Sequence, residues 1–324
     1  MTQHGDPTLA PRCVAVVGAG AVGGYFGAVL ARAGAAVTFL ARAAQAEAIE
    51  RDGLMVSHAS GEWRAPVRAT TRPADVADAD LLLVAVKSQD TEGAITGVKP
   101  HLRSDARILS MQNGVDNAAR IAAQVANPVY AAVVYVGADT EAPGRIRHNG
   151  RGDLVLGLPL AVPRRGDARR DLDAISGMFE RAGVRCPVSE NIDGALWTKL
   201  TLNCAYNAIS AIANLPYGAM VQSPEIRAVM EECVRETVRV ADAEGVGLAE
   251  EHLIAAVHKL VETMPDQYSS TAQDVQRGKP TEIDAINGYV AARGRAHGIP
   301  APVNQTLHAL VKLRERQYVR NPVS

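Results

Sequence analysis

Three polar side chains recur every four residues in one apolar segment and are the first candidates for chemistry. They are Lys199, Asn203 and Asn207, in residues 196–212 (LWTKLTLNCAYNAISAI). On a helix this spacing drifts by only about 40° per step, so the three form one stripe on an otherwise buried surface. Burying an amine and two amides without partners costs roughly several kcal/mol. Either a structural network with a neighbouring helix satisfies them, or the stripe lines a cleft that faces a cofactor and a substrate; we favour the cleft.

A second group of polar residues lies further along the chain, before another predicted helix. Residues 268–274 (YSSTAQD) offer hydroxyls, and residues 278–284 (GKPTEID) follow them. Thr281 can cap the next helix, and Glu282 and Asp284 lie favourably at its positive end. From the residues alone, Glu282 is therefore interpreted as an acid that starts a helix.

A glycine-rich turn near the N-terminus predicts a dinucleotide site. Residues 13–24 read CVAVVGAGAVGG, an apolar strand that runs into the pattern G-x-G-x-x-G. Gly18 allows the tight turn, Gly20 lets the backbone approach a pyrophosphate, and Gly23 lets the following helix pack against the strand. That helix should begin near Ala21 and direct its free N–H groups at the phosphates. Flavin proteins and methyltransferases use similar turns.

The residues after the second predicted strand indicate which nucleotide fits. Residues 37–40 (VTFL) are followed by Ala41 and Arg42, and no acid occurs until Glu47. An acid at this place binds the ribose 2′-hydroxyl of NAD, whereas an arginine accommodates the 2′-phosphate of NADP. Arg42 is either this phosphate ligand or a solvated surface charge. We favour NADP(H).

Two more polar residues follow predicted parallel strands. Lys87 comes after residues 80–86 (DLLLVAV), and Asn113 comes after residues 108–111 (ILSM). Ligands of doubly wound sheets bind beyond the carboxyl ends of the strands. Lys87 and Asn113 are thus expected at the cofactor edge, although polar residues are also common in strand-to-helix loops.

The remaining pattern predicts two domains. A doubly wound α/β domain is expected over residues 12–189, after a loose leader over residues 1–11, and a helical domain over residues 190–324. In the first domain we expect a hairpin around Ser60-Gly61, a strand over residues 129–136, and a turn-linked extension formed by two strands, 145–148 and 154–157. A helix over residues 167–181 and a strand over residues 184–188 should close the sheet. The second half should be helical, with helices over residues 196–212, 287–297 and 306–315.

Composition narrows the class of protein further. The 324 residues carry a formal net charge of −1, which argues against an electrostatic nucleic-acid binder. Membrane spans are not expected, because no apolar run approaches about 20 residues. A metal site is not expected either, because no histidine spacing suits metal ligation. We also expect no signal peptide. The four scattered cysteines are typical of reduced thiols in the cytoplasm. The sequence is compatible with a homodimer but does not fix the oligomeric state.

Together these pieces resemble the ketopantoate reductase (2-dehydropantoate 2-reductase) family from about Cys13 to the last helix. The resemblance rests on GAGAVGGYFG (18–27), LLLVAVKS (81–88), QNGVDN (112–117), LWTKLTLNCAYNAISAI (196–212), SSTAQDV (269–275) and TEIDAINGYV (281–290). It implies an α/β Rossmann-type doubly wound domain followed by an all-α C-terminal domain, with the active site between them. It also implies reduction of a 2-oxo acid by NADPH, in the branch of metabolism that makes pantothenate.

The resemblance also implies roles for individual residues. Lys199 matches the catalytic lysine that protonates the ketone oxygen, and Glu282 matches the acid that holds the substrate hydroxyl and aligns that lysine. This replaces the simple helix-start interpretation of Glu282. Substrate-binding positions are matched by Asn203, Asn207, Ser270 and Asn113, and Asn113 also matches the asparagine near the nicotinamide. Cofactor contacts are matched by Gly18, Ala19, Gly20, Ala21, Val22, Gly23, Arg42, Lys87, Asn113 and Glu282.

Two departures from some family members affect the substrate end. Tyr217 follows Pro216 where some members carry asparagine, and Gln267 stands near a second such position. They leave the identity of the 2-oxo acid open. A reductase of another 2-oxo acid and a non-catalytic NADPH-binding regulator remain as alternatives, and retention of Lys199 and Glu282 speaks against the regulator.

Overall fold

The computed structural model describes residues 11–320, with side chains through residue 317. These residues form two compact units. Unit 1 comprises the described residues up to Gln112 together with Asp116–Ile192, and unit 2 comprises Asn113–Val115 and the described residues from Asp193 onward. The expected leader over residues 1–11 lies outside the described part of the chain, apart from Pro11.

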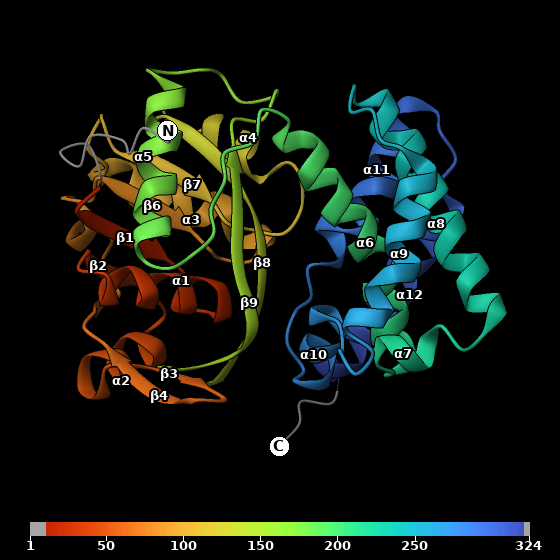
Figure 1. The fold of residues 1–324 in the computed structure, drawn as a ribbon, viewed down its shortest axis with the longest axis horizontal. Coiled ribbons are helices and arrows are strands. Elements are labelled where there is room, and N and C mark those ends of the chain that lie inside the picture. Colours follow the sequence, from red (N-terminus) through yellow and green to blue (C-terminus); the bar gives the residue numbers. More distant parts are fainter. Residues whose placement is uncertain (1–10, 321–324) are drawn as a thin grey trace. The chain divides into compact units, whose positions relative to one another are not determined.

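Unit 1 is built on a nine-stranded mixed sheet with the order β4-β3-β9-β8-β7-β6-β1-β2-β5 (Figure 1). Its pairings are parallel except for the hairpins β3–β4 and β8–β9. The strands are β1 (Cys13–Val17), β2 (Ala36–Leu40), β3 (Leu54–His58), β4 (Gly61–Ala65), β5 (Arg68–Thr70), β6 (Leu81–Val84), β7 (Arg107–Ser110), β8 (Val129–Ala142) and β9 (Arg145–Gly157).

Helices follow the strands β1, β2, β6, β7 and β9 of unit 1. They are α1 (Ala21–Arg32), α2 (Ala43–Asp52), α3 (Thr91–Val98), α4 (Asn117–Ala122) and α5 (Ala168–Arg181), with the short 3-10 turns η2 (Pro73–Val76), η3 (Ser88–Asp90) and η4 (Lys99–His101). Phe26 of α1 meets Phe179 of α5 edge to face at 6.0 Å between ring centroids. These two helices therefore share one face of the sheet, where buried aromatic and aliphatic side chains form the core.

Two strand predictions in unit 1 are wrong. The segments 145–148 and 154–157 are parts of one continuous strand, β9, because the intervening residues also pair with β8 through register shifts near Gly137. Residues 184–188 form no strand. They run beside β9, where the N–H groups of Leu154 and Leu156 donate to the carbonyl oxygens of Arg185 and Pro187, but the pairing amounts to a single bridge between Val188 and Leu156. Pro187 has no N–H to donate, and the N–H of Cys186 donates to the side chain of Glu180 instead.

The described residues of unit 2 form helices joined by loops, with no strand among them (Figure 1). Its helices are α6 (Ile192–Ala213), α7 (Tyr217–Met220), α8 (Pro224–Ala243), α9 (Glu250–Thr263), α10 (Ser270–Gln276), α11 (Asn287–His297) and α12 (Pro302–Arg320), with the 3-10 turn η5 (Ile283–Ala285). The predicted fold class, a Rossmann-type α/β domain followed by an all-α domain, is confirmed.

A buried acid fixes the start of α12 in unit 2. The carboxylate of Glu236, which is fully buried on α8, accepts hydrogen bonds from the backbone N–H groups of Val303 and Asn304 at 2.8 and 2.9 Å. Such bonds satisfy amides that a helix leaves free in its first turn. These bonds join α8 to α12 and so stabilise the packing of the two helices.

Candidate functional site

Lys199, Asn113 and Glu282 form one hydrogen-bonded cluster in unit 2. Nζ of Lys199 donates to Oδ1 of Asn113 at 3.0 Å, and Nδ2 of Asn113 donates to Oε2 of Glu282 at 2.8 Å. The three residues come from α6, from the segment that follows β7, and from the residue before η5. All three are half-buried. The amide thus connects an amine to a carboxylate that lies 83 positions further along the chain.

The surroundings of Lys199 bring its proton affinity close to neutral pH. Burial among protein atoms lowers the pKa of Lys199 from 10.5 to about 8, and the charge of Glu282 acts in the opposite direction. Desolvation disfavours the charged amine, while a nearby carboxylate favours it. Desolvation dominates, so Lys199 can hold and release a proton near physiological pH.

The backbone that carries Glu282 is tied to α12 on both sides. Thr281 donates from its N–H and its hydroxyl to Oε1 of Glu315 at 2.7 and 2.6 Å. Asp284 accepts from His308 at 2.6 Å and from Lys312 at 2.9 Å. These bonds hold the pKa of Asp284 down at about 2.

Glu282 itself occupies the N-cap position of η5 without a side-chain capping bond. The hydroxyl of Thr281 accepts instead from the N–H of Ile283 at 3.3 Å. Thr281 therefore makes the capping bond that the sequence predicted for it. The carboxylate of Glu282 accepts a hydrogen bond from Asn113 instead.

The two asparagines of the predicted stripe have side-chain amides without hydrogen-bond partners among residues 11–317. Asn203 is half-buried and Asn207 is 3% exposed. Only the backbone carbonyl of Asn207 is engaged, by the hydroxyl of Ser269 at 3.1 Å. A structural network with a neighbouring helix is therefore not formed by these two amides, which stay available to a ligand.

The serine pair divides into one structural and one exposed residue. Ser269 is the N-cap of α10, and its hydroxyl accepts from the N–H of Ala272 at 3.0 Å. Ser270, the predicted substrate position, is the first residue of α10 and is exposed.

The glycine turn of unit 1 has the backbone that its pattern predicts. Gly18 has φ +104°, and a Cβ there would lie 2.9 Å from the backbone of Ala85. A Cβ on Gly23 would lie 2.0 Å from the carbonyl oxygen of Gly18, whereas a Cβ on Gly20 would meet nothing within 4 Å. α1 begins at Ala21, as expected, and no side chain caps it. The N-terminus of α1 therefore has free N–H groups and open space at Gly20, which suit the binding of an anion. Ala19, Ala21 and Val22 belong to the same turn.

The two predicted cofactor cations follow strands that flank β1. Arg42 comes two residues after β2, and Lys87 comes three residues after β6. Because β1 pairs in parallel with both strands, their carboxyl ends reach one edge of the sheet. The guanidinium of Arg42 is exposed and pairs with Asp90 at 3.2 Å.

Sequence reasoning missed two residues that shape this edge. Gln45 donates to the carbonyl oxygen of Ala19 and accepts from the N–H of Gly144, so it joins the glycine turn to the β8–β9 hairpin. Asp90 pairs with Arg42. Asp90 could have been noticed as an acid close to Lys87, but nothing in the sequence signals the partners of Gln45.

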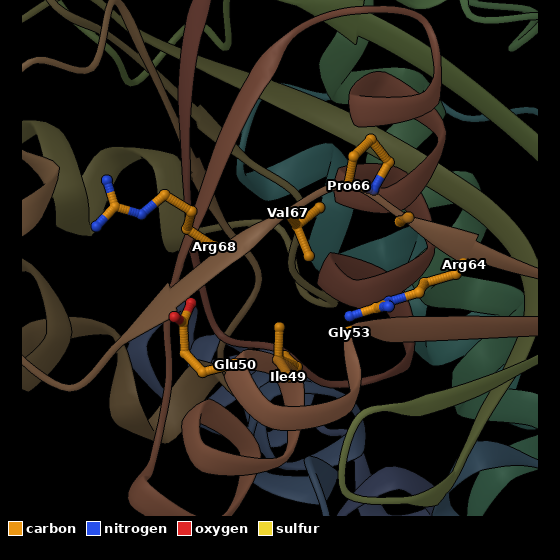
Figure 2. Close-up of a pocket in the computed structure, with 8 residues that line it drawn as sticks. Ile49, Glu50, Gly53, Arg64, Pro66, Val67 and Arg68 are labelled. Carbon is orange, nitrogen blue, oxygen red and sulfur yellow. The ribbon is translucent and has the colours of Figure 1, made fainter.

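A separate pocket of about 480 Å³ lies beside α2 in unit 1. Figure 2 shows Glu50, Arg64 and Arg68 around it, with Arg64 reaching towards Gly53 and Arg68 directed away. None of the predicted site residues lines this pocket. Within the described residues, no group of three histidine, cysteine or acidic side chains could hold a metal ion, and no helix is long and apolar enough to span a membrane.

Two family models match most of the chain. The model for ketopantoate reductase PanE/ApbA matches residues 14–159, and the model for its C-terminal part matches residues 191–315. A 2-dehydropantoate 2-reductase from Halobacterium salinarum is 36% identical over 94% of this chain and 99% of its own. The chain belongs to the ketopantoate reductase family. A relative with the same name from Vibrio cholerae is 32% identical over 94% and 98% of the two chains.

Solved structures of ketopantoate reductases have the same fold. A PanE/ApbA family ketopantoate reductase from Ralstonia eutropha is 46% identical, with a TM-score of 0.86 over 94% of this chain and 99% of that chain. The D-mandelate dehydrogenase bound to NADH and anilino(oxo)acetate has a TM-score of 0.87 over the same shares at 24% identity, a likeness of fold alone.

The two residues that depart from some ketopantoate reductases lie in different environments. Tyr217 is buried, and its ring packs 4.4 Å from that of Tyr206 in the core of unit 2. Gln267 is exposed and donates to the carbonyl oxygen of Tyr268. Tyr217 therefore contributes to packing rather than offering an amide.

Proposed function

We propose that this protein reduces 2-dehydropantoate to pantoate with NADPH, as a cytoplasmic enzyme of pantothenate biosynthesis. The observation that carries the proposal is the Lys199–Asn113–Glu282 cluster, which places a proton donor with a pKa of about 8 beside a carboxylate. The relatives named 2-dehydropantoate 2-reductase support the choice of substrate. We further propose residues 12–189 as the nucleotide domain and residues 190–324 as the catalytic domain.

When bound, NADPH would supply the hydride that reduces the ketone carbon of the substrate. The ammonium of Lys199 would give its proton to the ketone oxygen, so that the product is the alcohol. A cation near the developing alkoxide stabilises the transition state, and the proton then neutralises the product. Lys199 regains its proton from solvent. Asn113 and Glu282 orient the amine, and Glu282 also binds the substrate hydroxyl.

The cofactor is proposed to bind at the carboxyl edge of the sheet in unit 1. Gly18, Gly20 and Gly23, with the first turn of α1, would hold the pyrophosphate. Arg42 would hold the 2′-phosphate, and Lys87 would add positive charge. Asn113 would contact the nicotinamide. The open space at Gly20 and the missing side-chain cap of α1 support this assignment.

The substrate is proposed to contact Asn203, Asn207 and Ser270. The two unpartnered amides can donate to the carboxylate and accept from the hydroxyl of a hydroxylated 2-oxo acid. A second candidate is a 2-oxo acid other than 2-dehydropantoate. The burial of Tyr217 favours it, because this side chain packs in the core and offers no amide to the substrate.

Oxidation of NADPH by a panel of 2-oxo acids, followed at 340 nm in the steady state, tests the proposal. We expect the highest kcat/KM with 2-dehydropantoate and a loss of turnover by roughly 100-fold or more in Lys199→Ala. Lys259→Ala, an exposed lysine on α9, is the matched control. Equal turnover of Lys199→Ala and the wild type would exclude Lys199 as the acid, and turnover of another 2-oxo acid alone would favour the second candidate.

A further inference from the structure

Asp90 occupies a helix-capping position but does not cap the helix. It is the N-cap residue of α3, and its carboxylate makes no capping bond. Aspartate is among the residues that most often cap helices. Its Oδ2 instead accepts from Nη2 of Arg42 at 3.2 Å. The side chain of Asp90 therefore pairs with a residue in the turn after β2 and does not cap its own helix.

Buried hydrogen bonds fix the turn that carries Asp90. The N–H of Asp90 donates to the carbonyl oxygen of Lys87 at 2.8 Å. The carbonyl oxygen of Ser88 accepts from the hydroxyl of Thr91 at 2.9 Å and from Arg120 at 2.8 Å. Ser88 and Thr91 are 2% and 0% exposed. The backbone of Asp90 is consequently held in place, so its carboxylate stays beside this turn when the pairing with Arg42 is broken.

The pair is exposed enough to exchange partners. The side chain of Arg42 is 89% exposed and that of Asp90 is 44% exposed. Exposed ion pairs stabilise a fold by about 1 kcal/mol or less, so an incoming dianion can take the guanidinium. The carboxylate would remain within the screening length of about 8 Å at physiological salt, and would repel such a dianion.

We propose that Asp90 is a specificity-determining residue that reduces the preference of this protein for NADPH over NADH. The inference rests on the proposed function of Arg42 as the 2′-phosphate ligand. Asp90 competes with that phosphate for the guanidinium and repels it. NADH has no 2′-phosphate, so its binding is not opposed in this way.

Titration of the fluorescence of NADPH and NADH with wild type and Asp90→Asn tests the inference without turnover. The asparagine keeps the size and a hydrogen-bond acceptor but removes the charge. We expect the variant to bind NADPH roughly three- to tenfold more tightly, on the scale of one like-charge interaction in a solvated site. NADH affinity should change by less than about twofold. The gain for NADPH should shrink as salt is raised from low to high concentration.

Two further variants separate Asp90 from general charge effects. Asp105→Asn makes the same charge change at an exposed acid that pairs with Arg103 just before β7, at the amino end of that strand. It should leave the NADPH/NADH ratio as in wild type. In the Arg42→Ala background, Asp90→Asn should give a smaller gain than it gives alone.

An unchanged ratio in Asp90→Asn, or equal weakening of both cofactors, would overturn the inference. These outcomes are distinct from failure of the proposed function, in which the wild-type protein would bind neither nucleotide or would reduce no 2-oxo acid.

Discussion

Asn113 uses both ends of one amide to join Lys199 and Glu282. Its Oδ1 accepts from Nζ at 3.0 Å, and its Nδ2 donates to the carboxylate at 2.8 Å. An amide can accept and donate at once, whereas a carboxylate in its place could only accept. The orientation of the amine is therefore coupled to the carboxylate of Glu282, and a substitution of Glu282 should change the environment of the Lys199 amine.

The pH dependence of turnover should report this coupling. Lys199 must be protonated to act as an acid, so kcat/KM should fall as the pH rises through about 8. The charge of Glu282 raises the pKa of Lys199, so Glu282→Gln should move the falling limb to lower pH. Rate profiles from pH 6 to 10 measure it, with Glu251→Gln on α9 as control. A limb that stays at the same pH in Glu282→Gln would contradict the coupling.

Removing the lysine should stabilise the fold while it strongly lowers turnover. Burial lowers the pKa of Lys199, so the folded state disfavours the charged amine. The cost is fully present below about pH 8, where both states bind the proton, and is lost as the pH approaches 10.5, the unfolded value. Lys199→Met keeps the length without the charge. Its Tm should exceed that of wild type at pH 7, and the difference should narrow towards pH 10.5; a lower Tm at pH 7 would argue against this.

The sequence predicts much of the fold because local patterns decide it. The run from Leu81 to Val84 is apolar at every position, and it forms a central strand buried on both faces. Residues 145–148 and 154–157 read as separate strands because glycines and polar residues separate them. Pairing with β8, which no local pattern reveals, makes them one strand.

The sequence allows the residues of the candidate site to be proposed, but it does not predict the contacts between them. The four-residue spacing of Lys199, Asn203 and Asn207 places them on one face of α6, as periodicity requires. Nothing in the sequence shows that Asn113 bonds to Glu282 across 169 positions. Asp90 was missed because its partner Arg42 comes 48 positions earlier and the pairing depends on strand order.

Two glycines of one turn should respond differently to alanine. At Gly23 a Cβ would lie 2.0 Å from the carbonyl oxygen of Gly18, so Gly23→Ala must displace α1. Overpacking of this kind costs about 1–3 kcal/mol, which lowers Tm by several degrees. At Gly20 a Cβ meets nothing and φ is −81°, so Gly20→Ala should fold normally.

Gly20→Ala should instead raise the KM for NADPH by roughly tenfold, because its methyl group occupies space that the pyrophosphate needs. Thermal unfolding and cofactor titration on both variants measure the contrast. If Gly20→Ala binds NADPH as well as wild type does, the glycine turn is not the phosphate site.

The bonds from α12 should position Glu282 for turnover. Thr281 donates twice to Glu315, and Lys312 lies 2.8 Å from the same carboxylate. Glu315→Ala removes these bonds and should lower kcat by roughly three- to tenfold while the KM for NADPH stays unchanged. Glu315→Gln, which keeps an acceptor for Thr281, should recover part of the loss.

Arg316→Ala, at the exposed neighbour of Glu315 on α12, is the matched control for these variants. Equal losses in Glu315→Ala and Glu315→Gln would show that charge near α12, rather than the bonds to Thr281, matters for turnover.

The amides of Asn203 and Asn207 should matter for substrate and not for folding. Neither makes a side-chain hydrogen bond among residues 11–317, so Asn203→Ala and Asn207→Ala leave no protein group without its partner. Their free energies of unfolding should stay within about 0.5–1 kcal/mol of wild type, while the KM for the 2-oxo acid rises by roughly tenfold, the scale of one lost hydrogen bond. The KM for NADPH should not change.

Asn304→Ala provides the contrast. Asn304 is fully buried, and its amide bonds to Glu236 at 2.9 Å and to Asn287 at 2.9 Å. Its loss leaves those buried groups short of a partner, at a cost of about 1–3 kcal/mol or more for the charged one. In urea unfolding, Asn304→Ala should therefore lose stability while the two α6 variants do not. In steady-state kinetics, the two α6 variants should show the higher KM for the 2-oxo acid. If Asn207→Ala is destabilised as much as Asn304→Ala, the stripe of Lys199, Asn203 and Asn207 has a structural role rather than a role in binding substrate.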